Sequence, residues 1–208
     1  MKLYRFRTSD LQKLFNESLW KEVQMDEYSI DGHFVVDVHL TEAMLITALV
    51  IGARTKQHAD NLRVDEGMAG GYKEYVVGDY GTLAAAAYIY KNWLQGLDYV
   101  VFGKADEGDL KIGKQIADVK TGSRPNYKLF VVNKRQWNRK EYDFYIGCNV
   151  IELNKIVVMR IWGYITREKF KAEGTWNDFG YGPKYMALTI PYVELSDIRE
   201  LLGKSSTD

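Results

Sequence analysis

The sequence predicts an α/β fold in which helices flank a central mixed sheet. Apolar residues recur at helical spacing from Thr41 to Leu62, and the run Ala84-Ala85-Ala86-Ala87 strongly favours a helix. After Gly96 the pattern changes to short apolar runs that are typical of strands. Ser196 can then cap a short final helix that ends near Gly203. Helices, then strands, then a helix indicate an α/β sandwich around a mixed sheet.

Three helices are expected in the first half of the chain, over about residues 9–23, 41–62 and 78–94. Thr8 or Ser9 can cap the first and Thr41 the second, because a hydroxyl can accept a hydrogen bond from the first turn. Between them, Val35, Val36 and Val38 favour a strand over 34–40.

The second half is dominated by expected strands, over 99–102, 109–112, 116–120, 128–132, 143–151 and 156–165. Gly113-Lys114 is typical of a tight turn, so the two strands that flank it should pair with each other. A polar stretch around Gln136-Trp137 is consistent with a short helix.

Composition is that of a folded globular protein, with 208 residues, 46% apolar and 27% charged. We expect one domain over 1–208, made of a largely helical N-terminal extension (1–65) and a core (66–203). Cys148 is the one cysteine, which suits a reducing, cytoplasmic setting. No signal peptide is visible, and the longest apolar run, 43–51, is too short to cross a membrane.

Two aspartates and a lysine form the pattern that indicates chemistry. Asp109 and Asp118 lie on either side of the tight turn, so both carboxylates can lie at one place on the sheet and bind a hard cation such as magnesium. Lys120 follows Asp118 by two residues, and in a strand these side chains share a face. A divalent ion with a nearby lysine is suited to phosphodiester hydrolysis.

Two simpler interpretations stand beside this one. A carboxylate and a lysine two residues apart in a strand usually form a solvated face, although apolar neighbours around Asp118 indicate partial burial. The run from Gly108 to Gln115 nearly fits a phosphate-binding GxxxxGK[ST] loop. However, Gln115 replaces the required hydroxyl residue, and a strand rather than a helix should follow.

Asp109, the short turn and Asp118-Val119-Lys120 resemble the PD-(D/E)XK nuclease superfamily, which has the restriction-endonuclease-like fold. The resemblance covers roughly 72–203. It includes the helix that precedes the site (78–85), the strand, helix and strand that follow it (131–137 and 143–146), and tails like those of phage and viral members (161–166 and 192–202). It implies an α/β/α core around a central mixed sheet.

The resemblance also implies roles for individual residues. Asp109, Asp118 and the backbone carbonyl of Val119 would hold Mg²⁺, with Mn²⁺ as a possible substitute, and Lys120 would be the catalytic lysine. Many relatives carry a helix glutamate where this chain has Thr82. Glu74 or Asp79 is the alternative source of that carboxylate.

Seven basic residues and no acidic ones lie between Lys120 and Lys140, although the formal net charge of the chain is zero. Besides Lys120 itself, the basic residues of this segment are Arg124, Lys128, Lys134, Arg135, Arg139 and Lys140. Such a run is usually a solvated face, but beside a phosphate site it indicates a surface for the DNA backbone. Trp137 could stack on a base, although an aromatic residue at that position is more often part of the core.

The expected function is therefore that of a metal-dependent nuclease acting on DNA, as a homodimer, because cutting both strands of a duplex suits two-fold symmetry. The rival hypothesis is an inactive nucleic-acid-binding or assembly module with a nuclease-like fold. Thr82 favours the rival, and the set Asp109, Asp118 and Lys120 favours an enzyme.

Overall fold

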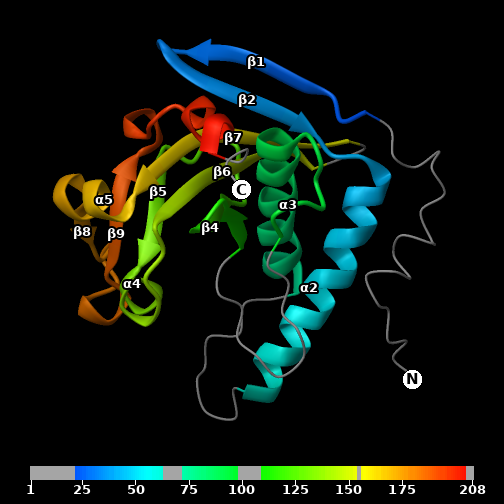
Figure 1. Cartoon of the computed structure of the whole chain (residues 1–208). Coiled ribbons are helices and arrows are strands. Elements are labelled where there is room, and N and C mark those ends of the chain that lie inside the picture. Colours follow the sequence, from blue (N-terminus) through cyan, green and yellow to red (C-terminus); the bar gives the residue numbers. More distant parts are fainter. Residues whose placement is uncertain (1–21, 63–71, 98–108, 154–155, 205–208) are drawn as a thin grey trace.

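A six-stranded mixed sheet is the centre of the computed structural model, which describes residues 22–62, 72–97, 109–153 and 156–204 (Figure 1). The strand order is β1-β2-β7-β6-β4-β3. Its strands are β1 (Met25–Ile30), β2 (His33–His39), β3 (Leu110–Ile112), β4 (Gln115–Gly122), β6 (Phe144–Leu153) and β7 (Val157–Thr166). The β4–β6 pair is parallel and the other neighbours are antiparallel, so the predicted mixed sheet is confirmed.

Two long helices, α2 (Glu42–Leu62) and α3 (Tyr72–Tyr90), lie on one face of this sheet. The predicted cap of α2 is confirmed, since Thr41 Oγ1 accepts a hydrogen bond of 3.3 Å from Met44 N. The alanines of α3 are completely buried against β4, β6 and β7, where their small side chains let the helix approach the sheet closely.

A second sheet covers part of the opposite face, in the order β5 (Leu129–Asn133), β9 (Ala187–Pro191) and β8 (Thr175–Asn177). Two short helices, α4 (Lys134–Arg139) and α5 (Arg167–Glu173), complete this layer, and Trp137 and Phe170 anchor them in its core. The fold is thus α/β with a six-stranded mixed sheet, but its second covering layer is largely β rather than helical as expected.

The strand expected over 34–40 is confirmed as β2, but β1 and the hairpin that joins it to β2 were not predicted. Asp31 and Gly32 form its turn with φ of 50° and 82°, and Asp-Gly between apolar runs is a strong hairpin signal. The N-terminal segment 1–65, expected as a largely helical extension, therefore also supplies two strands to the main sheet. Glu22 and Val23 are not helical, and the rest of the helix expected over 9–23 lies outside the described residues.

Two helix boundaries differ from expectation. Helix α3 begins at Tyr72 rather than near Gly78 and ends at Tyr90, where Lys91 adopts a φ of 54°. The final helix is a 3₁₀ helix, η4 (Ile198–Lys204), and the side chain of Asp197, not that of Ser196, accepts from the backbone at Arg199 N. Ser196 instead pairs with Tyr164 of β7. Two shorter 3₁₀ turns are η2 (Pro183–Tyr185) and η3 (Tyr192–Glu194).

The strand expected over 99–102 lies outside the described residues. Within the described part of the chain, no helix is long and apolar enough to cross a lipid bilayer.

Candidate active site

The turn at Gly113-Lys114 brings Asp109 and Asp118 together, as predicted. β3 and β4 pair antiparallel with Leu110 opposite Ala117, so Asp109 lies just before β3 beside Asp118. Asp109 N donates to Ala117 O over 2.9 Å, which fixes its backbone against β4. Gly113 supplies the φ of 58° that the tight turn requires. A strand follows the turn, so the phosphate-loop interpretation of 108–115 is wrong.

The carboxylate of Asp109 lies against the edge of β4 that β3 leaves uncovered. Its Oδ2 accepts a hydrogen bond of 2.7 Å from Val119 N. Since Val119 directly follows Asp118, standard bond lengths place the two carboxyl groups within about 7 Å of each other. In an extended strand the N–H and C=O of one residue point the same way, so the Val119 carbonyl is directed to the Asp109 side as well.

Asp118 is a buried charge on the opposite face from α3. Ala117 and Val119 pack under α3, so the alternation of the strand turns Asp118 and Lys120 to the other side. Asp118 is only 4% exposed, and its oxygens lie 2.8 Å and 2.6 Å from Lys120 Nζ. Because Asp118 is buried, the interpretation of this pair as a solvated face is wrong for Asp118. A buried carboxylate needs a cationic partner, and Lys120 provides it.

Asp79 is a buried carboxyl group of α3. Its Oδ2 is buried and accepts no hydrogen bond from the described residues, and it lies close to Gly52 of α2. Burial raises the pKa of Asp79 to about 8, and the negative charge of Asp109 adds to this effect. Asp79 is thus within electrostatic range of Asp109 on the α3 face, whereas Asp118 faces away from α3.

Thr82 and Glu74 are the other two α3 positions that the resemblance to the nuclease superfamily brought into question as the source of a helix carboxylate. Thr82 is one turn further along α3, and its hydroxyl donates to Gly78 O over 3.3 Å within the helix. Glu74 belongs to α3, but its side chain lies outside the described part of the structure.

A ring and a guanidinium beside Asp118 were not identified from the sequence. Tyr145 pairs with Asp118 across β4 and β6, and its hydroxyl accepts a hydrogen bond of 3.0 Å from Arg167. Burial raises the pKa of Tyr145 to about 12, Arg167 opposes the shift and Asp118 adds to it. Arg167 also lies 4.1 Å from the Trp137 ring and donates to Trp137 O. No local pattern could have linked Arg167 to Asp118, which lies far from it in the sequence.

The oxygen atoms of Asp109, Asp118 and Val119 are the groups near this edge of β4 that could bind a metal ion. Among the described residues, no three His, Cys, Asp or Glu side chains converge as a metal-binding group. Asp109 and Asp118 with the Val119 carbonyl would give three oxygen ligands, and Mg²⁺ commonly completes such a set with water. Asp79 Oδ2 lies against Gly52 of α2 on the α3 face, so the oxygen donors that fit a hard divalent ion are those of Asp109, Asp118 and the Val119 carbonyl.

The basic segment is divided into two groups by β5. Arg124 and Lys128 are exposed before the strand, and Lys134 and Arg135 are exposed after it. Six residues of extended chain from Lys128 to Lys134 correspond to about 20 Å. The side chain of Arg139 lies outside the described residues, and Lys140 is partly buried. Trp137 is 8% exposed and packs on Tyr145 and Phe170, so the core interpretation of Trp137 is confirmed.

Asp118 and Lys120 lie between these two basic groups. At one end, Asn149 binds the carbonyls of Arg124 and Tyr127 and pairs with Gly122 at the end of β4. At the other end, Trp137 of α4 stacks on Tyr145 with ring centres 5.8 Å apart.

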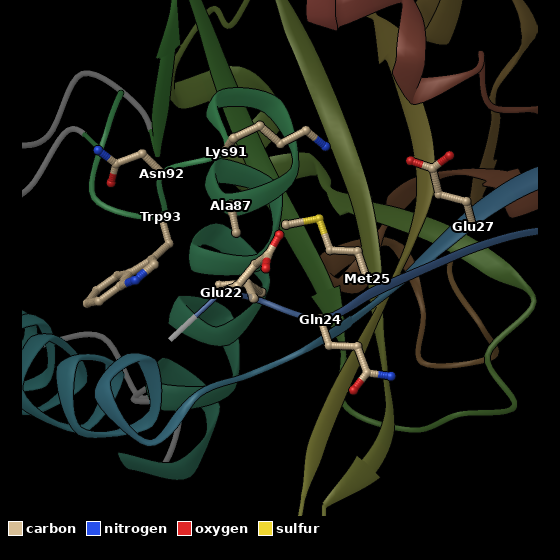
Figure 2. Close-up of a pocket in the computed structure, with 9 residues that line it drawn as sticks. Glu22, Gln24, Met25, Glu27, Ala87, Lys91, Asn92 and Trp93 are labelled. Atoms are coloured by element: carbon tan, nitrogen blue, oxygen red, sulfur yellow. The ribbon is translucent and has the colours of Figure 1, made fainter. Parts of the chain in front are cut away.

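A pocket of about 870 Å³ lies elsewhere, between β1 and the C-terminal end of α3 (Figure 2). Its lining residues are Glu22, Val23, Gln24, Met25, Glu27, Ala87, Lys91, Asn92 and Trp93. Figure 2 shows the carboxylate of Glu22 beside Met25 and Ala87, with the Lys91 side chain above them. None of the residues expected for phosphate chemistry lines this pocket, so it is separate from the candidate active site.

Comparison of the chain with family models, with curated proteins and with solved structures gave no match. A functional assignment therefore depends on the geometry of Asp109, Asp118, Val119 and Lys120 and on the surfaces around them.

Proposed function

We propose that this protein is a divalent-metal-dependent nuclease that hydrolyses DNA phosphodiester bonds. The observation that carries the proposal is the edge of β4, where Asp109 accepts a hydrogen bond from Val119 N next to the buried ion pair of Asp118 and Lys120.

Each group has a task in this chemistry. Asp109, Asp118 and the Val119 carbonyl would hold Mg²⁺ or Mn²⁺, which neutralises phosphate charge and lowers the pKa of a bound water. Lys120 would orient that water or steady the charge that develops on the phosphate. The ion pair of Lys120 with Asp118 keeps the buried carboxylate neutralised until a cation binds.

The arrangement of elements supports a restriction-endonuclease-like core as part of the proposal. Helix α3 precedes the β3–β4 hairpin, and β5, α4 and β6 follow it in the order that the resemblance implies. The largely β second layer is a departure from a simple α/β/α sandwich.

Two observations favour the rival, an inactive binding or assembly module. The described residues do not form a three-carboxylate cluster, and Thr82 uses its hydroxyl within α3. A protein of this kind would bind nucleic acid through its basic groups without cutting it.

Cleavage assays distinguish the two functions. We expect the purified protein to cut at least one of linear, circular, branched or single-stranded DNA with Mg²⁺ or Mn²⁺, and none with EDTA. Lys120→Ala should remove cleavage, and Lys114→Ala in the adjacent turn is the matched control that should retain it. Binding without cleavage of any substrate would establish the rival, and equal cleavage by Lys120→Ala would show that the activity arises elsewhere.

A further inference from the structure

Four large aromatic side chains are exposed on and next to the loop between β8 and β9. Trp176, Phe179, Tyr181 and Tyr185 have 40%, 45%, 75% and 45% of their surface accessible. Rings of this size are usually buried, because each removes a large apolar area from water. Their concentration in ten residues of one loop indicates a surface used for binding.

The backbone of this loop makes local hydrogen bonds of its own. Phe179 N donates to Asn177 Oδ1 over 2.6 Å, and Tyr181 N donates to Asp178 O over 2.8 Å. Phe179 has a φ of 50°, a left-handed conformation that a bulky residue rarely adopts, and the adjacent glycine continues it. Tyr181 and Tyr185 contact each other edge to face with centres 6.2 Å apart.

The loop is joined to the second basic group. Lys134 N donates to Met186 O over 2.8 Å, so the start of α4 is fixed to the end of the loop, as their neighbouring positions in Figure 1 show. Lys134 Nζ lies 6.0 Å from the centre of the Trp176 ring. The Asp178 carboxylate is directed to the backbone, where Oδ1 accepts from Gly180 N.

Ring contacts connect this surface to the candidate active site. Trp176 packs on Trp137 at 6.5 Å, and Trp137 stacks on Tyr145 at 5.8 Å. Tyr145 is the β6 neighbour of Asp118. The exposed rings are thus joined to the strand beside Asp118 through two buried rings, Trp137 and Tyr145.

We infer that Trp176, Phe179, Tyr181 and Tyr185, with Lys134 and Arg135, form an aromatic–basic platform for the unpaired bases of single-stranded nucleic acid. The inference deepens the proposed nuclease function, on which it rests, by naming the substrate class as DNA with a single-stranded segment.

The chemistry of the platform favours this ligand over others. Unpaired bases expose flat faces that stack on aromatic rings, and the phosphates that link them are bound by lysine and arginine. In a blunt duplex the base faces are stacked on one another and unavailable to the rings. A lipid surface would also bind exposed rings, but it has no flat faces that stack on them.

Binding without turnover tests the platform. In EDTA, fluorescence anisotropy would compare a fluorescein-labelled thymidine 20-mer with a blunt 20-base-pair duplex. We expect tighter binding to the single strand. Tyr181→Leu, which retains an apolar side chain but removes the ring, should weaken single-strand binding by about 5- to 150-fold, the range measured for lost base stacking. Tyr181→Trp should restore it.

Ile156→Ala provides the surface control. Ile156 is 53% exposed and directly precedes β7, whereas α5 follows the opposite end of that strand. This variant should bind like the wild type. Unchanged binding by Tyr181→Leu, equal affinity for the duplex, or a ring-dependent dimer in sedimentation without single-strand binding would overturn the platform. Ring-dependent binding by a protein that cuts nothing with Mg²⁺ would instead retain the platform and reject the nuclease.

Discussion

Asp79→Asn tests the buried environment that the structure assigns to this carboxyl group. The pKa of Asp79 is raised from 3.8 to about 8, first by burial and then by the charge of Asp109. The folded protein therefore holds this proton more tightly than the unfolded chain does. The free energy of unfolding should fall as pH rises from about 4 to about 8 and become level above the folded pKa.

The size of the stability change follows from the difference between the folded and unfolded pKa of Asp79. Each unit of pKa difference corresponds to about 1.4 kcal/mol, so at pH 7 the ionisation of Asp79 in the unfolded chain costs at most about 4 kcal/mol of stability. Asparagine has a similar shape and does not titrate. The variant should consequently equal the wild type near pH 4 and exceed it increasingly up to pH 8.

Urea unfolding of both proteins at half-unit steps from pH 4.5 to 8.5 would measure this difference. Asp31→Asn is the matched control, since Asp31 is exposed in the β1–β2 turn and asparagine tolerates its φ of 50°. A stability difference between wild type and Asp79→Asn that stays constant with pH would refute the burial of Asp79 beside Asp109.

Two further predictions concern the helix–sheet contact and the DNA surface. Gly81→Ala should destabilise the fold by about 1–3 kcal/mol in urea, because its methyl group would overlap with Thr121 Oγ1. Gly78→Ala in the same helix meets nothing within 4 Å and should stabilise the fold by about 0.5–1 kcal/mol; a destabilised Gly78→Ala would contradict this packing. Charge reversal at Lys134 and Arg135 should flatten the log–log salt dependence of duplex DNA binding by about 0.9 per lost phosphate contact, and an unchanged slope would place the DNA elsewhere.

Local sequence signals were sufficient for most elements around the site. The Gly113-Lys114 turn set the pairing of β3 with β4, and strand alternation set the shared face of Asp118 and Lys120. These predictions hold because turn geometry and side-chain alternation act between residues close in the chain.

Features that depend on distant contacts could not be predicted in this way. The buried position of Asp79 depends on α2, and the contact of Arg167 with Tyr145 joins α5 to β6. The basic segment was expected as one surface, but β5 within it pairs with β9 and divides it. Only tertiary structure determines such arrangements.

The β1–β2 hairpin is a different case, because its Asp31-Gly32 turn was visible in the sequence. The strand signal in 25–30 is weak, since Asp26, Glu27 and Ser29 face solvent on this edge strand. Pairing with β2 compensates for that weak local preference.

Calorimetric titration with Mn²⁺ tests most directly whether Asp109 and Asp118 hold a divalent ion. We expect the wild type to bind Mn²⁺ and Asp118→Asn to bind it much more weakly, because an amide is a poor ligand for a hard cation. Lys120→Ala should bind at least as tightly as the wild type, since the ammonium that contacts both oxygens of Asp118 no longer competes with the ion. Circular dichroism would verify that each variant is folded. No Mn²⁺ binding by the wild type, or equal binding by Asp118→Asn, would contradict a metal site at this edge of β4.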